Sequence, residues 1–317
     1  MLQLTFNQPL AEGRFSAMAS DCQVLMECTD WLLAARLLEG VQRECQRIEH
    51  KFSRYRADSV IAQIHAAQGQ PVTVDAETAR LLDFADQLYR LSEGAFDISA
   101  GVLREVWQFD GSDRVPSMQA VHACLARVGW SKVDWQSPQL TLPQGMQIDL
   151  GGIGKEYAVD RCFDWLASQF DGAFLINFGG DLRARGPRLS GQAWQVGIES
   201  ISGPDSDQAI SNKKTQTASQ PTSQKPAAAQ LALMTGAVAT SGDSKRYVLH
   251  QGQRLGHILD PRTGWPVQHA PHAITVYAQT CTQAGMVATL AMLQGANAAT
   301  FLAEQQQLQE IQSWMQA

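Results

Sequence analysis

Three glycines within four residues, directly before a lysine, constrain this chain more than any other segment. Residues 148–155 read I-D-L-G-G-I-G-K. Glycine permits tight turns and lets backbone groups approach a ligand closely, while a helix N-terminus that carries a lysine attracts anions. The segment therefore predicts a strand at 147–150, a turn, and a helix that begins at or near Lys155, with phosphate or pyrophosphate as the ligand. It lacks the GK[ST] ending of a P-loop and the GxGxxG pattern, so a tight turn with a solvated lysine is the alternative.

Hydrophobic periodicity predicts helices and strands on both sides of this segment. Apolar residues at helical spacing follow Asp30, a candidate N-cap, and Asp75, whose helix ends before Gly94. Further helices are expected at 117–129 and after Thr282. Because helices and strands do not alternate regularly, the pattern favours a mixed α/β (α+β) fold over a doubly wound sheet. The expected strands are 147–150, 173–178, 194–199, 246–250, 256–259 and 273–278.

Residues 202–229 differ in composition from the rest of the chain. They are rich in Ser, Thr, Gln, Pro and Ala and contain almost no large apolar side chain. Such a segment cannot bury enough apolar surface to offset the entropy that it would lose on ordering. We therefore interpret 202–229 as a disordered surface insertion. The chain length of 317 residues allows one large domain or two ordinary ones.

Charge and cysteine usage exclude several classes of protein. The net charge is −6 without a basic stripe, so nucleic acid is not an expected partner. The six cysteines occur singly, without a CxxC pair, which argues against structural zinc and favours a reducing compartment. The N-terminus lacks the pattern of a signal peptide and no apolar run is long enough to cross a bilayer, so membrane insertion is not expected. The expected location is the cytoplasm, or the periplasm if the N-terminus was trimmed.

Other segments carry residues that suit a ligand site, although each also has a structural interpretation. Residues 177–183, N-F-G-G-D-L-R, predict a sharp turn that Asp181 caps. His257, with Asp260 nearby, suits general-base chemistry because the pKa of histidine lies near neutrality, but a lone histidine is often structural. Aromatic and hydroxyl side chains that either border a ligand or pack in the core occur at 52–56, 94–99 and 239–243.

The order of these segments is more specific than any one of them, because together they resemble the FAD:protein FMN transferase (ApbE) family. The resemblance extends from about Met18 to Gly295. Its blocks are F-S-x-Y-x-x-x-S at 52–59, G-A-F-D at 94–97, D-L-G-G-I-x-K-x-Y-A-x-D at 149–160, G-G-D-L-R at 179–183, A-V-A-T-S-G-D at 237–243 and H-I-L-D-P-R-T-G at 257–264.

The resemblance implies a single domain over 1–317 with a T-fold-like core, an FAD cleft, and magnesium beside the pyrophosphate of FAD. In such an enzyme a Thr or Ser hydroxyl of an acceptor flavoprotein attacks the phosphorus on the riboflavin side, so that FMN is transferred and AMP leaves. Positioning and charge neutralisation dominate phosphoryl transfer, usually through a divalent ion and a cationic side chain. The implied acceptor residue is a Thr in an S/T-G-A-T-like motif.

The resemblance also implies roles for individual residues. His257 and Asp243 match the residues that prepare the acceptor hydroxyl for attack. Gly152, through its carbonyl group, and Thr289 match magnesium ligands. The positions that match contacts with FAD are Met18, Tyr55, Ala95, Phe96, Asp97, Asp149, Lys155 and Leu259.

One position departs from the family pattern. Members carry A-D-A-L-A-T after the last core strand, and its Asp and Thr bind the metal, whereas residues 284–289 read A-G-M-V-A-T. Gly285 thus replaces the expected acid, and no acid lies between Asp260 and Glu304 to substitute locally. Magnesium prefers hard oxygen ligands, which the phosphates of FAD could supply in part. On this basis we expect Gly285→Asp to tighten magnesium binding.

The glycine at 285 leaves three functions open. The chain could transfer FMN with a depleted metal site, bind FAD without catalysis as a carrier or scaffold, or hydrolyse FAD to FMN and AMP. The retained His257, Asp243, Asp260 and Lys155 favour the transferase.

Overall fold

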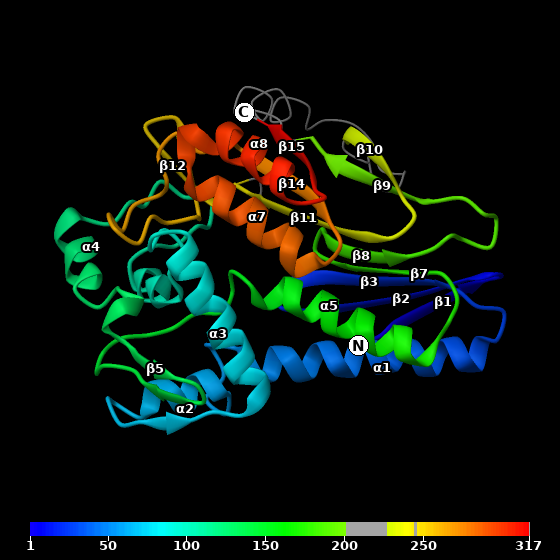
Figure 1. The fold of residues 1–317 in the computed structure, drawn as a ribbon, viewed down its shortest axis with the longest axis horizontal. Coiled ribbons are helices and arrows are strands. Elements are labelled where there is room, and N and C mark those ends of the chain that lie inside the picture. The colour runs from blue at the N-terminus through cyan, green and yellow to red at the C-terminus, as the bar shows by residue number, and fades with distance from the viewer. Residues whose placement is uncertain (201–226, 244–245, 317) are drawn as a thin grey trace, which may run out of the picture.

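One antiparallel sheet of eight strands forms the centre of the structure, a computed structural model that describes residues 1–200, 227–243 and 246–316 (Figure 1). N-terminal and C-terminal segments meet in its middle, where β3 pairs with β7 and β8 pairs with β11. In spatial order the strands are β1 (Gln3–Asn7), β2 (Leu10–Ala17), β3 (Ser20–Glu27), β7 (Phe174–Phe178), β8 (Asp181–Arg185), β11 (Gly236–Gly242), β14 (Ala273–Ala278) and β15 (Gln312–Gln316).

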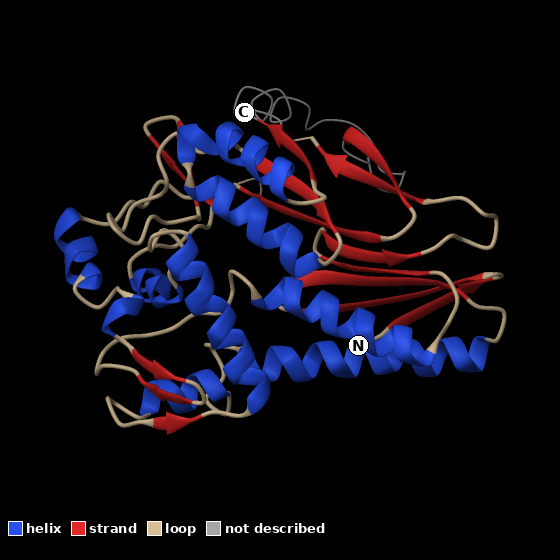
Figure 2. Ribbon diagram, in the orientation of Figure 1, coloured by secondary structure: helices blue, strands red, loops and turns tan. Residues whose placement is uncertain are grey.

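Four helices cover one face of this sheet, as Figure 2 shows. They are α1 (Trp31–Phe52), α5 (Gly154–Gln169), α7 (Cys281–Leu293) and α8 (Ala298–Leu308). Asp30 caps α1 by accepting hydrogen bonds from the backbone N–H groups of Leu32 and Leu33, as its sequence position predicts.

The strands alternate between a face buried under the helices and a face turned to the other side. In β7, Phe174, Ile176 and Phe178 join the main core, whereas Leu175 and Asn177 lie on the opposite face. Strand β3 follows the same period of two, since Val24 and Met26 are buried while Gln23 and Asp21 are not. The opposite face of the sheet is therefore available for a ligand.

A two-stranded ribbon partly covers that opposite face. Strand β9 (Trp194–Glu199) pairs with β10 (Ala227–Leu233). Trp194 and Leu233 pack there against Leu175, Leu182 and Val238.

The remaining elements lie mainly at one end of the sheet. They are the helices α2 (Val60–Ala66), α3 (Ala76–Leu91) and α4 (Met118–Leu125), the 3-10 helices η1 (Ile98–Glu105), η2 (Trp130–Lys132) and η3 (Gly295–Asn297), the small sheet β4 (Val72–Thr73), β6 (Gln139–Thr141) and β5 (Asp134–Gln136), and the hairpin β12 (Tyr247–His250) with β13 (Gln253–Gly256).

The mixed α+β class is confirmed, and the strands expected at 194–199 and 273–278 match β9 and β14. The strand at 147–150 is wrong, because this segment has no ladder partner: the N–H of Ile148 donates to His65 Nε2 and that of Asp149 to the carbonyl of Ile98. The strand at 256–259 is also wrong, since β13 ends at Gly256 and the chain then turns.

Two further expectations need correction. The helix predicted at 117–129 ends at Leu125, ahead of Gly129, whose φ of 132° is incompatible with a helix. Of the insertion predicted at 202–229, residues 227–229 belong to β10, and 202–226 lie outside the described residues. Residues 227–229 are ordered because their backbone pairs with β9.

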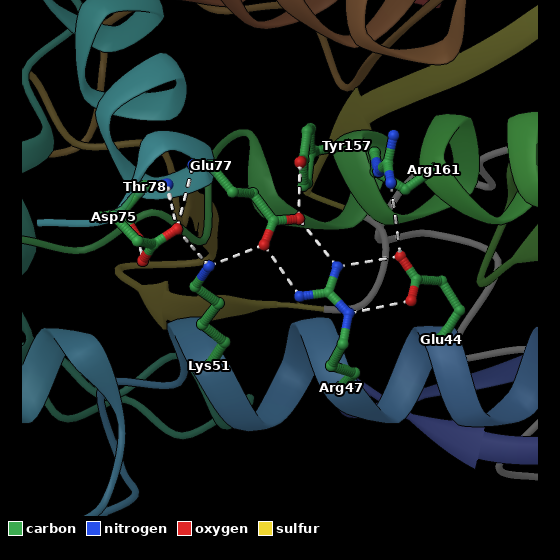
Figure 3. A network of polar contacts seen from close by, with 8 residues as sticks. All are labelled: Glu44, Arg47, Lys51, Asp75, Glu77, Thr78, Tyr157 and Arg161. Carbon is green, nitrogen blue, oxygen red and sulfur yellow. Dashed lines mark hydrogen bonds and ion pairs between the residues drawn. The ribbon is translucent and has the colours of Figure 1, made fainter.

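An ion-pair network joins α1, α3 and α5 beside the N-terminus of α5 (Figure 3). Glu77 of α3 accepts hydrogen bonds from Arg47 at 2.8 Å and from Lys51 at 2.7 Å, both on α1. Tyr157 of α5 donates its hydroxyl to the same carboxylate at 2.8 Å. Because Tyr157 follows Lys155 by two residues, this network helps to fix the start of α5.

The Glu77 carboxylate makes stability depend on pH. Hydrogen bonds from Arg47, then from Lys51 and Tyr157, outweigh burial and lower the pKa of Glu77 to about 2. The folded-state pKa is below the unfolded value near 4.5, so this contribution is present above pH 4.5 and is lost as the pH falls toward 2. We expect Glu77→Gln to lower the free energy of unfolding at pH 7 by about 1–2 kcal/mol, and to lose less stability than the wild type between pH 4.5 and 3. Urea unfolding across this range checks it, with the exposed Glu304→Gln as control; parallel pH profiles would contradict it.

Candidate functional site

A cleft of about 1520 Å³ opens on the sheet face away from the helices and extends to the N-terminus of α5. It is larger than the roughly 300–1,000 Å³ that is typical of small-molecule pockets, so it can hold an extended ligand. All the predicted site residues except Asp243 line it. These residues are Met18, Tyr55, Ala95, Phe96, Asp97, Asp149, Gly152, Lys155, His257, Leu259 and Thr289.

The N-terminus of α5 presents a lysine held by a buried acid. Helix α5 begins at Gly154. Its N-cap residue, Ile153, has no side chain that can accept hydrogen bonds from the first backbone N–H groups of the helix. Lys155 Nζ lies 2.5 Å from Asp181 Oδ2. Burial lowers the pKa of Lys155, but the Asp181 carboxylate outweighs this effect and keeps the pKa above its ordinary value. The helix N-terminus and the Lys155 ammonium group suit an anionic ligand, with Asp181 as the counter-ion of the lysine.

Asp181 has a different role from the turn cap that the sequence predicts. It is the first residue of β8, it is 2% exposed, and it accepts a hydrogen bond from the N–H of Thr240 on β11. The turn before it is made by Gly179 and Gly180, both at positive φ. Its position as an acid directly after two glycines is the sequence signal that it serves the site.

Asp160 of α5, which was not predicted as a site residue, connects α5 to α7. Its carboxylate accepts hydrogen bonds from the N–H groups of Cys281 and Thr282 at 2.9 and 2.8 Å, and from the Thr282 hydroxyl at 2.7 Å. Arg183 of β8 donates to it at 3.0 Å. In the sequence, Asp160 is the last residue of the glycine-rich block at 149–160, and this position is the only signal of its role.

Several expected ligand contacts are already engaged in internal bonds that shape the cleft wall. Asp97 accepts from the N–H and hydroxyl of Ser99 and from the N–H of Trp130. Asp149 accepts from the N–H of Gly151 at 2.8 Å and from Arg54 at 3.2 Å. These bonds hold the loops at 95–101 and 149–154, and contact of either carboxylate with a ligand stays a prediction.

Two other predicted contacts lie at turns. Met18 occupies the turn between β2 and β3, where Met18 and Ala19 both have positive φ, and its N–H donates to Glu49 of α1 at 2.5 Å. Tyr55 is 82% exposed and lies on the cleft wall, with the Arg54 guanidinium 5.7 Å from the centre of its ring, and its contact with a ligand stays a prediction.

His257 directly follows β13 and reaches the cleft with a neutral ring. Its Nδ1 is buried and has no hydrogen-bond partner among the described residues. Burial, followed by the positive charges of Arg104 and Arg246, lowers the pKa of His257 to about 4. At neutral pH the imidazole is therefore uncharged and able to accept a proton.

Asp243 is not among the residues that line the cleft, and its predicted role in preparing the acceptor hydroxyl stays a prediction. Its Oδ2 lies 2.9 Å from Nδ1 of His272, and its N–H donates to the carbonyl of His272. Asp260 is also engaged, since it bonds Arg262 within its own turn. His257 thus has no carboxylate partner recorded among the described residues.

The space beside Gly285 is occupied by the side chain of Glu156. A Cβ added there would lie 2.5 Å from Cγ and 2.7 Å from Oε1 of Glu156, the residue after Lys155. An Asp side chain at 285 would have to displace the Glu156 side chain, and the effect of Gly285→Asp on magnesium binding stays a prediction. An acid does lie beside this position, but it comes from α5.

No cluster of three His, Cys, Asp or Glu side chains suited to a metal occurs within 1–200, 227–243 and 246–316. A cation at this cleft would need other oxygens, such as the Gly152 carbonyl and the Thr289 hydroxyl, which lies 2.8 Å from Ser241 Oγ. The six cysteines are all buried free thiols. None of the described helices is long and apolar enough to cross a membrane.

Comparison with known proteins gives consistent matches over most of the chain. The ApbE family model matches residues 18–312. The FAD:protein FMN transferase of Haemophilus influenzae is 28% identical over 281 residues, which cover 85% of this chain and 76% of that protein. One from Klebsiella pneumoniae is 31% identical over 254 residues, covering 78% and 71%.

Solved structures match the fold over nearly its whole length. The ApbE protein of Thermotoga maritima superposes with a TM-score of 0.81 at 27% identity, covering 96% of this chain and 94% of that chain. The flavin transferase ApbE of Vibrio cholerae gives a TM-score of 0.76 at 25% identity, covering 97% and 94%.

The lysine at the start of α5 leads to a prediction about anion binding. We expect Lys155→Met to weaken FAD binding by about 1.5–3 kcal/mol, roughly ten- to hundredfold in Kd, because a charge-assisted contact to phosphate is lost. Flavin fluorescence titration measures it, and Arg36→Met on the exposed side of α1 is the matched loss of a positive charge. Equal affinities of the two variants would show that Lys155 does not contact the ligand.

Proposed function

This chain belongs to the ApbE family, and we propose that it transfers FMN from FAD to a hydroxyl group of an acceptor protein and releases AMP. The observation that carries the proposal is the cleft itself. One wall presents the uncapped N-terminus of α5 with Lys155, and the other presents the neutral imidazole of His257. Relatives that match most of the chain bear the name of this reaction.

The cleft supports each step of such a transfer. The acceptor hydroxyl oxygen forms a bond to the phosphorus on the riboflavin side of FAD, and the bond from that phosphorus to the bridging oxygen breaks. AMP leaves with the bridging oxygen, and the hydroxyl proton passes to His257. Lys155 and the N–H groups at the start of α5 stabilise the negative charge on the phosphates. Arg104, which lines the cleft near His257, adds a second positive charge.

A divalent cation bound with the phosphates would neutralise the charge that develops during transfer. The residues fit such an ion, because the Thr289 hydroxyl and the Gly152 carbonyl are hard oxygen donors that line one cleft. A buried carboxyl oxygen without a hydrogen-bond partner among the described residues, Oε2 of Glu156, belongs to the same cleft wall.

We propose that the acceptor is a flavoprotein subunit in which a Thr of an S/T-G-A-T-like motif receives the FMN. An exposed loop suits this role, because the hydroxyl must enter the cleft as far as His257. The partner is thus a protein segment instead of a nucleic acid or a lipid.

Intact-mass spectrometry of a small acceptor domain tests the function. The domain carries the Thr motif and is incubated with this protein, FAD and magnesium, and we expect a mass gain of one FMN residue together with one AMP. A Thr→Ala acceptor is the control. An unmodified acceptor with FAD bound and no AMP released would indicate a non-catalytic binder, and release of FMN and AMP in solution would indicate FAD hydrolysis; either result rejects the transferase.

The low pKa of His257 gives this reaction a defined pH dependence. The base must be uncharged, so its contribution is present above pH 4 and is lost as the pH falls through about 4. A histidine of ordinary pKa would lose this contribution at a higher pH, about 6.5. We expect His257→Asn to slow transfer by roughly 10²–10⁴-fold while FAD affinity is kept. Single-turnover rates between pH 4 and 8 check both statements, with the exposed His122→Asn as control. A wild-type rate that falls already near pH 6.5 would contradict them.

A further inference from the structure

Glu156 and Gly285 face each other across two helices. Glu156 is on the first turn of α5, and Gly285 is buried on α7. The space that a side chain at 285 would occupy contains the Glu156 carboxyl group, as the distances of 2.5, 2.7 and 2.9 Å from an added Cβ to Cγ, Oε1 and Cδ show. A glycine at 285 is therefore required for this side chain to reach its position.

The two helices cannot easily change this arrangement. Asp160, one turn after Glu156 on α5, holds the N–H groups of Cys281 and Thr282 at the start of α7. The Tyr157 hydroxyl is bonded to Glu77 on the other side of α5. The hydrogen bonds of Asp160 and Tyr157 thus fix the orientation of α5, which places the Glu156 side chain against α7.

The carboxyl group of Glu156 lacks the partners that a buried acid requires. Oε2 is buried and has no hydrogen bond from any of the described residues, even though the rest of the residue is partly exposed in the cleft. Lys155, its neighbour in sequence, directs its ammonium group to Asp181 at 2.5 Å. A buried carboxyl oxygen without a donor is costly, and a bound cation relieves that cost.

The oxygens near this carboxyl group suit a hard cation. Thr289 is one helical turn after Gly285 on α7, and Gly152 lies in the turn before α5; both line the cleft together with Glu156. Magnesium is commonly held by one or two carboxylates, further oxygens and substrate phosphates, so a single carboxylate here is sufficient.

We propose that Glu156 supplies from α5 the carboxylate ligand of the divalent cation, in place of the acid that α7 lacks at Gly285. The inference rests on the proposed function, since the phosphates of FAD complete the ligand set. The Glu156 side chain reaches from α5 to the space beside Gly285 on α7. The Thr289 hydroxyl and the Gly152 carbonyl are the other protein ligands.

Burial, reinforced by the negative charge of Asp181, raises the pKa of Glu156 above its ordinary value against the opposing effect of the Lys155 ammonium group. This direction agrees with the geometry, because one carboxyl oxygen of Glu156, Oε2, is buried without a hydrogen bond from the described residues. A divalent ion bound there would favour the carboxylate.

Binding of Mn²⁺ in the presence of saturating FAD tests whether Glu156 is the carboxylate ligand of the cation. Calorimetry and electron paramagnetic resonance measure the Mn²⁺ affinity of the wild type, Glu156→Gln, Gly285→Asp and the double variant Glu156→Gly/Gly285→Asp. We expect Glu156→Gln to weaken Mn²⁺ binding at least tenfold, Gly285→Asp to lower Tm without tightening the binding, and the double variant to recover affinity to within a few-fold of the wild type. Glu304→Gln, far from the cleft wall, should match the wild type.

Each outcome decides the assignment. Unchanged Mn²⁺ affinity in Glu156→Gln overturns it, and so does a Gly285→Asp protein that binds Mn²⁺ more tightly than the wild type with its Tm unchanged. Should the double variant fail to fold, as circular dichroism would reveal, Glu156→Gln alone decides. FAD binding without metal is measured separately by flavin fluorescence. Loss of Mn²⁺ binding in Glu156→Gln, combined with no FMN transfer by the wild type, would retain the metal ligand and reject the proposed function.

Discussion

The carboxylate of Asp160 connects the three elements on which the cleft depends. Asp160 lies on α5 and accepts hydrogen bonds from Arg183 of β8 and from two backbone N–H groups at the start of α7. A buried charge with this many donors is well compensated, so α5, α7 and the sheet have a fixed relative position. The lysine at the start of α5, the glycine on α7 and the acid that begins β8 derive their geometry from this junction.

Charge is distributed unevenly along the cleft. Lys155 and Arg104 line it, and burial, followed by the positive charges of Arg104 and Arg246, lowers the pKa of His257 so that its imidazole is uncharged at neutral pH. In the proposed function, anion binding and proton acceptance are linked, because positive charge beside a phosphate site adds to the effect of burial on the pKa of His257. The Asp243–His272 pair lies outside this arrangement and stabilises the segment between β11 and β14.

The proposed metal site differs from the family motif in the helix that supplies its acid. At Gly285 the sequence alone indicated a missing acid, and the structure places Glu156 in the same space. A metal site requires oxygens at given points in space, whichever helix they come from.

The sequence by itself determined much of this protein: the Asp30 cap, the alternating strand at 174–178, the lysine at the N-terminus of α5 and the order of blocks that identifies the family. These features are encoded by neighbouring residues, so periodicity and local spacing reveal them. Only the tertiary structure decided that residues 147–150 form no strand, that Asp243 bonds His272, that Asp181 bonds Lys155 and that Glu156 occupies the space at Gly285. Each of these depends on a partner distant in the chain, and a local pattern does not contain the identity of that partner.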